Sequence, residues 1–444
     1  GDMHFLMRLP WLALALCRVT IDACPPHLRE VEPAMTFPVE TVRAAFPSLH
    51  VPRSGGVPIF FDNPAGTQVP RQVIDAVTDY YTRMNANSGG QFGTSADSDA
   101  MVAAVRGKLA AFLNAPRPEE IVIGPNMTTL NFGLSRALAR TFSPGDEIVL
   151  THMDHDGNVA PWLRIAEDGG FTVRWIDLRR EDGTLDLASL DAVLGPRTRL
   201  VATVHASNAL GTINPVAEIA RRAHAVGALH VVDAVQSAPH LSIDVQAIGC
   251  DFLLCSAYKF FGPHQGILWG RYDLLASLPA YKVRPSKDVP PYRWETGTSA
   301  FELIAGVGGA LDYLASLGQG DTLREQFVSA FEVMGNYERE LTGHLLDVLE
   351  ETPGVTIAGI TDRSRLAERV PTVICAVDGQ DPAVTAARLA AEGVFVWDGN
   401  YYAVEVMKVL QREREGMVRI GLAHYNTHDE IDRFGAALRR AARG

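Results

Sequence analysis

Two charged residues follow apolar segments in the middle of the chain. Asp233 ends the run Leu229-His-Val-Val, and Lys259 comes soon after Asp251-Phe-Leu-Leu, in a turn bounded by Gly262-Pro263. A buried carboxylate without a partner costs several kcal/mol, so Asp233 needs one. A lysine removed from water has its pKa lowered toward that of a nucleophilic amine. The two residues therefore indicate either a reactive lysine near a carboxylate or an ion pair that joins two strands.

The elements that must position these residues are short apolar runs alternating with amphipathic stretches. Such alternation is typical of a mostly parallel sheet with helices on both faces. In open α/β sheets ligands bind at the carboxyl ends of the strands, so the polar residues after each run are the candidates for chemistry. The seven runs begin at Ile121, Glu147, Phe171, Leu200, Leu229, Asp251 and Gly266.

One strand–helix–strand unit can be predicted in detail. Asn214 is expected to cap a helix that has Pro215 at its first position. Apolar residues at helical spacing continue to Ala225, and Gly227 is expected to end the helix just before the next strand.

The pattern changes after Gly320. A long helical stretch from Leu323 to Leu349 precedes a Pro353-Gly354 turn, short strands and a final helix from Asp429. This order predicts a smaller α+β domain at the C-terminus. We expect an N-terminal extension over residues 1–34, a large domain over 35–310 and a small domain over 311–444.

Composition excludes several classes of protein. The chain has 444 residues, of which 47% are hydrophobic and 21% charged, as in a globular protein of more than one domain. A net charge of −12 without a long basic block argues against nucleic acid, and no apolar run reaches the roughly 18 to 20 residues of a membrane span. Five scattered cysteines favour a reducing compartment, by default the cytoplasm. The apolar run Leu9–Cys17 leaves export as the alternative.

Seven ordered motifs together resemble the class V aminotransferase and cysteine desulfurase family, enzymes of fold type I that depend on pyridoxal phosphate. The similarity runs from about Phe60 to Arg440. It implies a large cofactor-binding domain with a mostly parallel seven-stranded sheet and a smaller C-terminal α+β domain. The motifs are Phe61-Asp62-Asn63-Pro-Ala-Gly66, Asn208-Ala-Leu-Gly-Thr212, Asp233-Ala-Val-Gln236, Ser256-Ala-Tyr-Lys259 with Gly262-Pro263, Arg293-Trp-Glu-Thr-Gly-Thr298, Arg419 and Tyr425-Asn426-Thr427.

The resemblance also implies roles for individual residues. Lys259 would hold pyridoxal 5'-phosphate as a Schiff base and would move the proton of the substrate Cα. Asp233 would keep the pyridine nitrogen protonated, and His155 would stack on the ring. Further cofactor contacts are implied for Asn126, Met127, Thr128, Asn208, Gln236, Ser256, Tyr258 and Thr298.

Some of these implied roles have a clear physical basis. The turn Asn126-Met127-Thr128 opens a helix, whose free N–H groups and positive dipole end suit a phosphate. Tyr258 stands where desulfurases usually have histidine. Thr298 would reach the phosphate of the neighbouring subunit, which implies a homodimer with shared active sites. Arg419 would bind the carboxylate of a small amino acid substrate through two parallel donors.

The match fails at the loop that carries the sulfur-accepting cysteine in desulfurases. Alignment puts Tyr402 at the cysteine position and Trp397 at an arginine position. Cys250, Cys255 and Cys375 lie in apolar runs and are interpreted as core residues. We therefore predict an aminotransferase or a C–S or C–Se lyase without the loop cysteine, with racemisation or epimerisation still open. The alternative is a catalytically silent protein of the same fold that binds a ligand or a sulfur-transfer partner.

Two other patterns are interpreted as structural. His152-Met-Asp154-His155-Asp156 contains metal-ligand residue types, but alternating side chains on an extended turn rarely converge on one ion, so no metal is predicted. Gly306-Val-Gly308-Gly309 lacks the preceding strand and the third spaced glycine of a dinucleotide site. Close packing between helices is predicted there instead.

Overall fold

A computed structural model describes residues 37–53 and 56–443. These residues belong to one compact unit. The predicted extension over residues 1–34 lies outside the described residues. The apolar run Leu9–Cys17, on which the alternative of export depends, lies outside them too. Within them, no helix is both long enough and apolar enough to cross a membrane. The boundary expected between residues 310 and 311 stays a prediction.

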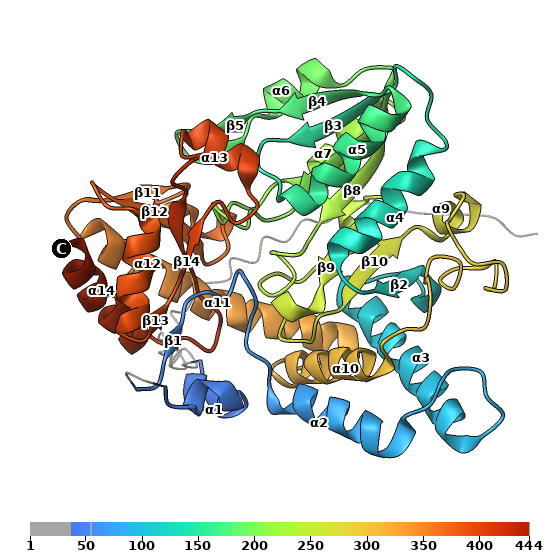
Figure 1. The fold of residues 1–444 in the computed structure, drawn as a ribbon, viewed down its shortest axis with the longest axis horizontal. Coiled ribbons are helices and arrows are strands. Elements are labelled where there is room, and N and C mark those ends of the chain that lie inside the picture. The colour runs from blue at the N-terminus through green and yellow to red at the C-terminus, as the bar shows by residue number, and fades with distance from the viewer. Residues whose placement is uncertain (1–36, 54–55, 444) are drawn as a thin grey trace, which may run out of the picture. The chain divides into compact units, whose positions relative to one another are not determined.

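A seven-stranded sheet forms the centre of the larger part of this unit (Figure 1). Its strand order is β2-β10-β9-β8-β7-β3-β4. β10 runs antiparallel to both of its neighbours, and the other pairs in this sheet are parallel. The predicted fold class is confirmed, because each predicted run forms one strand of this sheet. The bounds are β2 (Ile121–Gly124), β3 (Glu147–Thr151), β4 (Thr172–Ile176), β7 (Thr198–Val204), β8 (Leu229–Asp233), β9 (Phe252–Ser256) and β10 (Gly266–Gly270).

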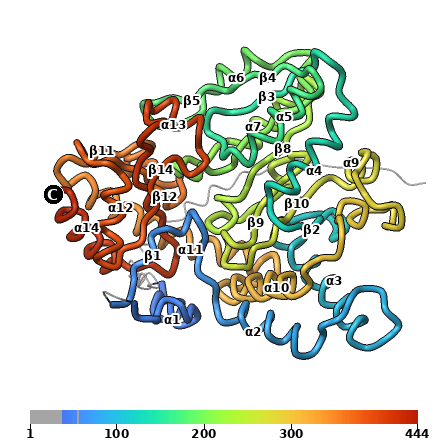
Figure 2. Tube along the Cα trace, viewed as in Figure 1, coloured from blue at the N-terminus to red at the C-terminus, as the bar shows by residue number. Residues whose placement is uncertain are grey.

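Both faces of this sheet are buried under helices, as Figures 1 and 2 show. Ile121 and Ile123 pack into a core with α3 and α10, whereas Val122 between them packs into a core with α4 and α5. Alternate residues of a strand point to opposite faces, so a strand covered on both sides reads as a continuous apolar run. The helices named here are α3 (Gly93–Leu113), α4 (Met127–Ala139), α5 (Ala160–Gly169) and α10 (Phe301–Ser316).

The order of the central strands brings the candidate residues together. β7, β8 and β9 are parallel neighbours, with Val204 paired to Asp233 and Asp233 paired to Leu254. The carboxyl ends of parallel strands meet at one edge of a sheet. The turns that follow these three strands therefore lie side by side, and the last of them carries Lys259.

The predicted strand–helix–strand unit forms, but its start differs from the prediction. The helix α7 spans Val216–Ala225 with Pro215 at the N-cap, so the prediction of Asn214 as the cap was wrong. The buried Asn214 amide instead donates to the Val204 carbonyl at 2.9 Å, because this turn must be tied to the end of β7. Gly227 follows the helix with φ of 80°, as predicted for its end.

A smaller antiparallel sheet forms the C-terminal part, with the order β11-β12-β15-β14. Figure 1 shows it in orange and red beside the larger sheet. The long helix and the final helix predicted here are confirmed as α11 and α14. The bounds are α11 (Leu323–Glu350), β11 (Val355–Ala358), β12 (Thr372–Val377), α12 (Pro382–Ala391), β14 (Trp397–Gly399), α13 (Val404–Leu410), β15 (Met417–Gly421) and α14 (His428–Ala442).

An early segment of the chain joins this C-terminal part. The strand β1 (Ile59–Phe60) pairs in parallel with β13 (Val394–Phe395), and Asp62 forms a bridge to Gly421 at the end of β15. The remaining elements lie around the larger sheet and its connections. They are α1 (Val39–Ala44), α2 (Arg71–Asp79), β5 (Leu178–Arg179), β6 (Thr184–Leu185), α6 (Leu187–Val193), α8 (Val245–Ile248) and α9 (Tyr272–Ser277).

The glycine-rich segment of α10 packs closely against α2, which confirms the packing interpretation of that segment. A Cβ atom on Gly309 would lie 2.5 Å from the Gln72 carbonyl oxygen and 3.0 Å from the Val73 Cα. A Cβ atom on Gly306 would lie 2.9 Å from a methyl group of Val77. The two helices can approach this closely because these positions carry no side chain.

Replacing Gly309 with alanine is expected to destabilise the protein by about 1–3 kcal/mol, because the new methyl group meets backbone that cannot move aside. Gly335→Ala in α11 is the matched control, since its Cβ would meet the flexible end of Arg339 at 3.4 Å. That change is expected to be neutral or to stabilise by up to about 1 kcal/mol. Thermal unfolding followed by circular dichroism compares the two, and equal midpoints would contradict the packing.

Candidate active site

A cavity of about 670 Å³ opens where the turns after the central strands face the C-terminal sheet. Every residue that the sequence predicts for the site lines this cavity, with the exception of Thr298. The residues brought together are Asn126, Met127, Thr128, His155, Asn208, Asp233, Gln236, Ser256, Tyr258, Lys259 and Arg419. Their individual roles are not tested by this placement and stay predictions.

Lys259 lies in the short helical turn that follows β9. Its Nζ donates to the Pro64 carbonyl oxygen and lies 4.7 Å from the centre of the Tyr258 ring. The amine borders the cavity and is otherwise enclosed by protein. Burial lowers its pKa to about 7, and the positive charge of Arg419 adds to this effect. A substantial fraction of this amine is therefore uncharged at neutral pH and can act as a nucleophile or a base.

Asp233 is the last residue of β8 and is buried. Its Oδ1 accepts a hydrogen bond from the Val235 N–H at 2.9 Å. Burial raises its pKa to about 6, although the Val235 N–H and the charge of Lys259 act in the opposite direction. A cationic group placed against this carboxylate would stabilise its ionised form.

His155 is held as a neutral ring. Burial lowers its pKa to about 4, and the positive charges of Lys259 and Arg419 contribute. Its Nδ1 accepts a hydrogen bond from the Gly157 N–H at 2.9 Å, which fixes the ring against the turn. A neutral aromatic ring in this position can pack on a flat ligand without adding charge to the site.

The other members of the apparent metal pattern point elsewhere. His152 stacks on Trp175 with 5.0 Å between ring centres. Asp154 is buried, accepts from the Thr151 hydroxyl and from Asn158 Nδ2 at 2.7 Å, and has its pKa raised to about 8 by burial. In residues 37–53 and 56–443, no three His, Cys, Asp or Glu side chains are grouped to hold a metal ion.

The N-terminus of α4 faces the same cavity. The Asn126 side chain caps this helix by accepting from the Thr129 N–H at 2.8 Å, and the Met127 N–H donates to Ser256 Oγ at 3.0 Å. Gly266 lies so close to the Asn126 backbone that a side chain there would collide with it. The positive end of the helix dipole makes this a position for an anionic group.

Arg419 enters the cavity from β15. Its guanidinium lies 4.5 Å from the centre of the Tyr401 ring, and Nη1 donates to the Asn208 carbonyl oxygen at 3.0 Å. Burial lowers its pKa to about 10, so it stays charged at neutral pH. A buried guanidinium with donors left over is suited to bind a carboxylate.

Some cavity residues were not singled out from the sequence. Phe132, His264 and Tyr401 line the cavity, and the His264 ring stacks on Tyr258 with 4.8 Å between ring centres. His264 directly follows the Gly262-Pro263 motif, so proximity in sequence could have indicated it. Phe132 and Tyr401 carry no local signal, because their placement depends on how distant segments pack.

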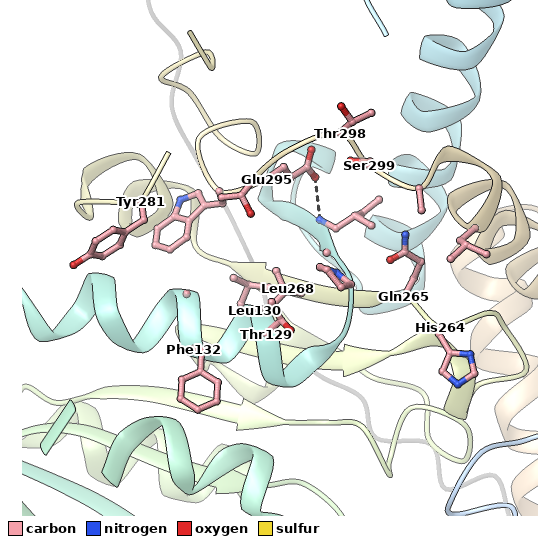
Figure 3. Close-up of a pocket in the computed structure, with 18 of the residues that line it drawn as sticks. Thr129, Leu130, Phe132, His264, Gln265, Leu268, Tyr281, Glu295, Thr298 and Ser299 are labelled. Atoms are coloured by element: carbon pink, nitrogen blue, oxygen red, sulfur yellow. Dashed lines mark hydrogen bonds between the residues drawn. The ribbon is translucent and has the colours of Figure 1, made fainter. Parts of the chain in front are cut away.

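Thr298 lines a second cavity of about 580 Å³. Figure 3 shows it there beside Ser299 and Glu295, whose carboxylate accepts from the Ile123 N–H at 2.9 Å. His264 lines both cavities, so the second one adjoins the first. Within its own chain, Thr298 is thus separate from the other predicted cofactor contacts.

Comparison with known proteins gives one consistent family. Residues 59–434 match the family described as Aminotransferase class-V. A cysteine desulfurase from Serratia proteamaculans is 34% identical over 421 residues, which cover 91% of this chain and 98% of that protein. One from Enterobacter is 36% identical over 428 residues, covering 91% and 98%. The apo structure of a cysteine desulfurase from Thermococcus onnurineus NA1 superposes with a TM-score of 0.82 at 28% identity, covering 93% and 99%.

The fold and the site thus define an enzyme of fold type I that depends on pyridoxal 5'-phosphate. The chain belongs to the class V aminotransferase family, and the predicted resemblance is confirmed.

The residues around the cavity fit this cofactor. Asn208 Oδ1, Gln236 Oε1 and Arg419 Nε are buried and have no hydrogen-bond partner among the residues that the structure describes, although all three residues line the cavity. Buried polar atoms are normally paired, so a polar ligand is expected to satisfy them. The donor set also matches the cofactor in chemical terms. An amine stands ready for its aldehyde, a carboxylate for its ring nitrogen and a helix N-terminus for its phosphate.

The lowered pKa of Lys259 makes the stability of the cofactor-free protein depend on pH. The unfolded lysine holds its proton up to about pH 10.5, whereas the folded one releases it near pH 7. Between these values the unfolded state binds more protons, so the free energy of unfolding rises with pH.

We compare the cofactor-free wild-type protein with its Lys259→Met variant. The free energy of unfolding of the wild type is expected to rise relative to that of the variant between about pH 7 and about pH 9. The change amounts to at most about 1.4 kcal/mol per pH unit. Urea titrations of both proteins measure it. A difference that stays flat over this interval would show that the lysine is not desolvated.

Proposed function

We propose that the protein acts on a small α-amino acid, as an aminotransferase or as a C–S or C–Se lyase that works without a loop cysteine. The observation that carries the proposal is the convergence of Lys259, Asp233 and Arg419 on one cavity. Pyridoxal phosphate, when bound, supplies an electron-withdrawing ring that stabilises negative charge on the Cα atom of an amino acid. The side chains around the cofactor determine which bond of the substrate Cα atom is broken.

Lys259 has two tasks in this proposal. Its amine holds the cofactor in the resting enzyme, and during turnover Nζ takes or returns the proton at Cα. A pKa of about 7 suits both tasks, since neither the proton acceptor nor the donor form is rare at neutral pH. Asp233 would hold the ring nitrogen of the cofactor with its negative charge, and the neutral ring of His155 would pack on the cofactor ring.

Polar groups at the two ends of the cofactor would fix its position. The Asn126-Met127-Thr128 turn, with Ser256 and Tyr258, would bind the phosphate. Asn208 and Gln236 would bind the ring oxygen, which accounts for their unpaired oxygens if a proton is shared there. Each of these contacts restrains the tilt of the ring against Lys259.

Arg419 would orient the substrate. Its guanidinium is positioned by the Asn208 carbonyl and by the Tyr401 ring, so its free donors have a defined direction. Binding the substrate carboxylate there fixes the rotation about the Cα–N bond, and with it the bond that points out of the ring plane. Transamination and elimination both begin by removing the Cα proton, and the same arrangement serves either.

The relatives are named cysteine desulfurases, but the described cysteines do not support a protein-bound sulfur intermediate. Cys250, Cys255 and Cys375 are buried and unpaired, and none of them lines the cavity. Burial raises the pKa of the Cys375 thiol to about 12 and raises those of Cys250 and Cys255 further. A thiol must ionise to attack sulfur, so these three side chains are poor acceptors. Cys17 and Cys24 lie outside the described residues.

We also propose a homodimer with shared sites, in the cytoplasm. Thr298 does not line the active-site cavity of its own chain, which agrees with a role at the phosphate of a partner subunit. The exposed aromatic residues Tyr281 and Tyr292 lie in the same region of sequence and offer apolar surface for a second copy. Unpaired cysteines agree with a reducing compartment.

A catalytically silent protein that binds a ligand or a sulfur-transfer partner is the second candidate. The observation in its favour is Tyr402 at the cavity, where the desulfurase loop carries its cysteine. This second candidate predicts that the absorbance spectrum of the bound cofactor does not change when amino acids are added. Our proposal predicts that at least one amino acid changes it.

Lys259 is expected to carry the cofactor covalently. Borohydride reduction of the purified holoenzyme, followed by peptide mass spectrometry, should place the cofactor on Lys259. Lys259→Ala should lose both this label and the Schiff-base absorbance band at the short-wavelength end of the visible spectrum. Lys287→Ala, at an exposed lysine, should keep both. A label on another lysine would contradict the assignment.

Sulfur from L-cysteine, if it is released, is expected to leave without forming a persulfide on the protein. Mass spectrometry after a single turnover should find Cys250, Cys255 and Cys375 unmodified. Pyruvate, sulfide, pyridoxamine phosphate and Cα deuterium exchange are measured separately, so that each possible reaction is identified by its own product. Tyr402→Cys is the positive control for detection, since its thiol would face the cavity. A persulfide on any of the five cysteines of the chain would refute the proposed route.

A further inference from the structure

An aromatic rim borders the outer part of the active-site cavity. We define it as Trp397 at the start of β14, with Tyr401 and Tyr402 in the turn that follows this strand; all three line the cavity. Trp397 is 49% exposed and Tyr402 is 68% exposed. Large aromatic side chains at the mouth of a cavity offer wide apolar contact to a ligand at low entropic cost.

The turn that carries the rim is held in place. The Tyr401 carbonyl accepts from Asn208 Nδ2 at 2.9 Å, and the Tyr402 carbonyl accepts from the Asp156 N–H at 2.7 Å. The Tyr401 hydroxyl donates to the Met417 carbonyl oxygen. Tyr401 and Tyr402 have φ of 51° and 58°, a conformation that bulky residues keep only when their surroundings impose it. The rim is therefore preorganised, and a ligand need not order it.

The rim lies beside the proposed carboxylate site. Trp397 is paired directly with Arg419 across two antiparallel strands, so the two side chains share one face of the sheet. The Tyr402 ring is 5.4 Å from the ring of His155, on the side of the cavity where the cofactor ring would lie. A substrate whose carboxylate is bound by Arg419 would thus have its side chain next to Trp397 and Tyr402.

Charge at the rim narrows the class of substrate. Asp156 also lines the cavity, and the negative charge of Glu405 is near enough to help raise the pKa of Asp156, after burial. These carboxylates disfavour a substrate with an acidic side chain. A basic side chain placed against the rings of Trp397 and Tyr402 would lose hydration without gaining a carboxylate partner from either ring.

We propose that Trp397 and Tyr402 determine specificity by selecting an α-amino acid with an uncharged aromatic side chain. This inference rests on the proposed function, because it takes Arg419 as the site of the substrate carboxylate.

The test measures binding of carboxylic acids that lack the α-amino group and so cannot react with the cofactor. Isothermal titration calorimetry of the holoenzyme compares 3-phenylpropanoate with butanedioate, which carries an acidic side chain, and with 4-guanidinobutanoate, which carries a basic one without a primary amine. We expect 3-phenylpropanoate to bind about tenfold more tightly than either of the others. This ranking in the wild-type protein needs no variant and no turnover.

Variants locate the preference at the rim. Tyr402→Ala and Trp397→Ala are each expected to weaken 3-phenylpropanoate about fivefold, with little effect on butanedioate. Tyr402→Phe keeps the ring and is expected to bind like the wild type. Tyr272→Ala, on α9 outside the cavity, where the ring contacts Arg117, is the matched control for loss of an aromatic side chain.

Each outcome decides the inference. Equal affinities, or a preference for butanedioate or 4-guanidinobutanoate, would overturn it, and so would rim variants that bind 3-phenylpropanoate as the wild type does. Visible absorbance recorded on every sample separates this failure from failure of the proposed function. If the cofactor band is present and at least one amino acid changes it, the specificity inference alone is refuted. If the wild-type protein lacks the band, or no amino acid changes it, the proposed function fails and the inference fails with it.

Discussion

The desolvation of one amine is the constraint on which the site depends. Lys259 lies in the turn that follows β9, beside the parallel strand β8, which ends in Asp233, and both side chains are withdrawn from bulk water. Charging either group alone is costly in this position, which is why the pKa of the lysine is lowered and that of the aspartate is raised. A ligand with an aldehyde that reacts with Lys259 and a basic nitrogen that pairs with Asp233 would remove the free-energy cost of burying both groups.

The C-terminal sheet supplies the side of the cavity to which we assign substrate recognition. Arg419 and Trp397 come from it, and the early segment that contains Pro64 links it to Lys259. The side chain of Asn63 forms this link through two hydrogen bonds. Its Nδ2 donates to the Gly421 carbonyl at 2.9 Å, and its Oδ1 accepts from the Tyr425 hydroxyl. The Pro64 carbonyl that holds Lys259 is therefore tied to the strand that carries Arg419.

Sequence patterns predicted the sheet and most of the site because the relevant signals are local. Buried parallel strands appear in the sequence as apolar runs, and the residues proposed to contact the cofactor lie at or after the carboxyl ends of these strands, as Asp233 and Lys259 do. Other features depend on contacts between distant segments. Asn214 has the residue type of a helix cap but is used to tie a turn to β7, and Tyr401 adopts a left-handed conformation that its residue type disfavours. Likewise, the proximity of Tyr402 to His155 arises from tertiary packing.

A crystal structure of the protein grown with pyridoxal 5'-phosphate tests the central claim most directly. The account predicts continuous electron density from Lys259 Nζ into the cofactor, with the ring nitrogen at hydrogen-bonding distance from the Asp233 carboxylate and Nζ released from the Pro64 carbonyl. A cofactor bound elsewhere, or a Lys259 amine that stays on Pro64 while the ring nitrogen faces away from Asp233, would contradict it.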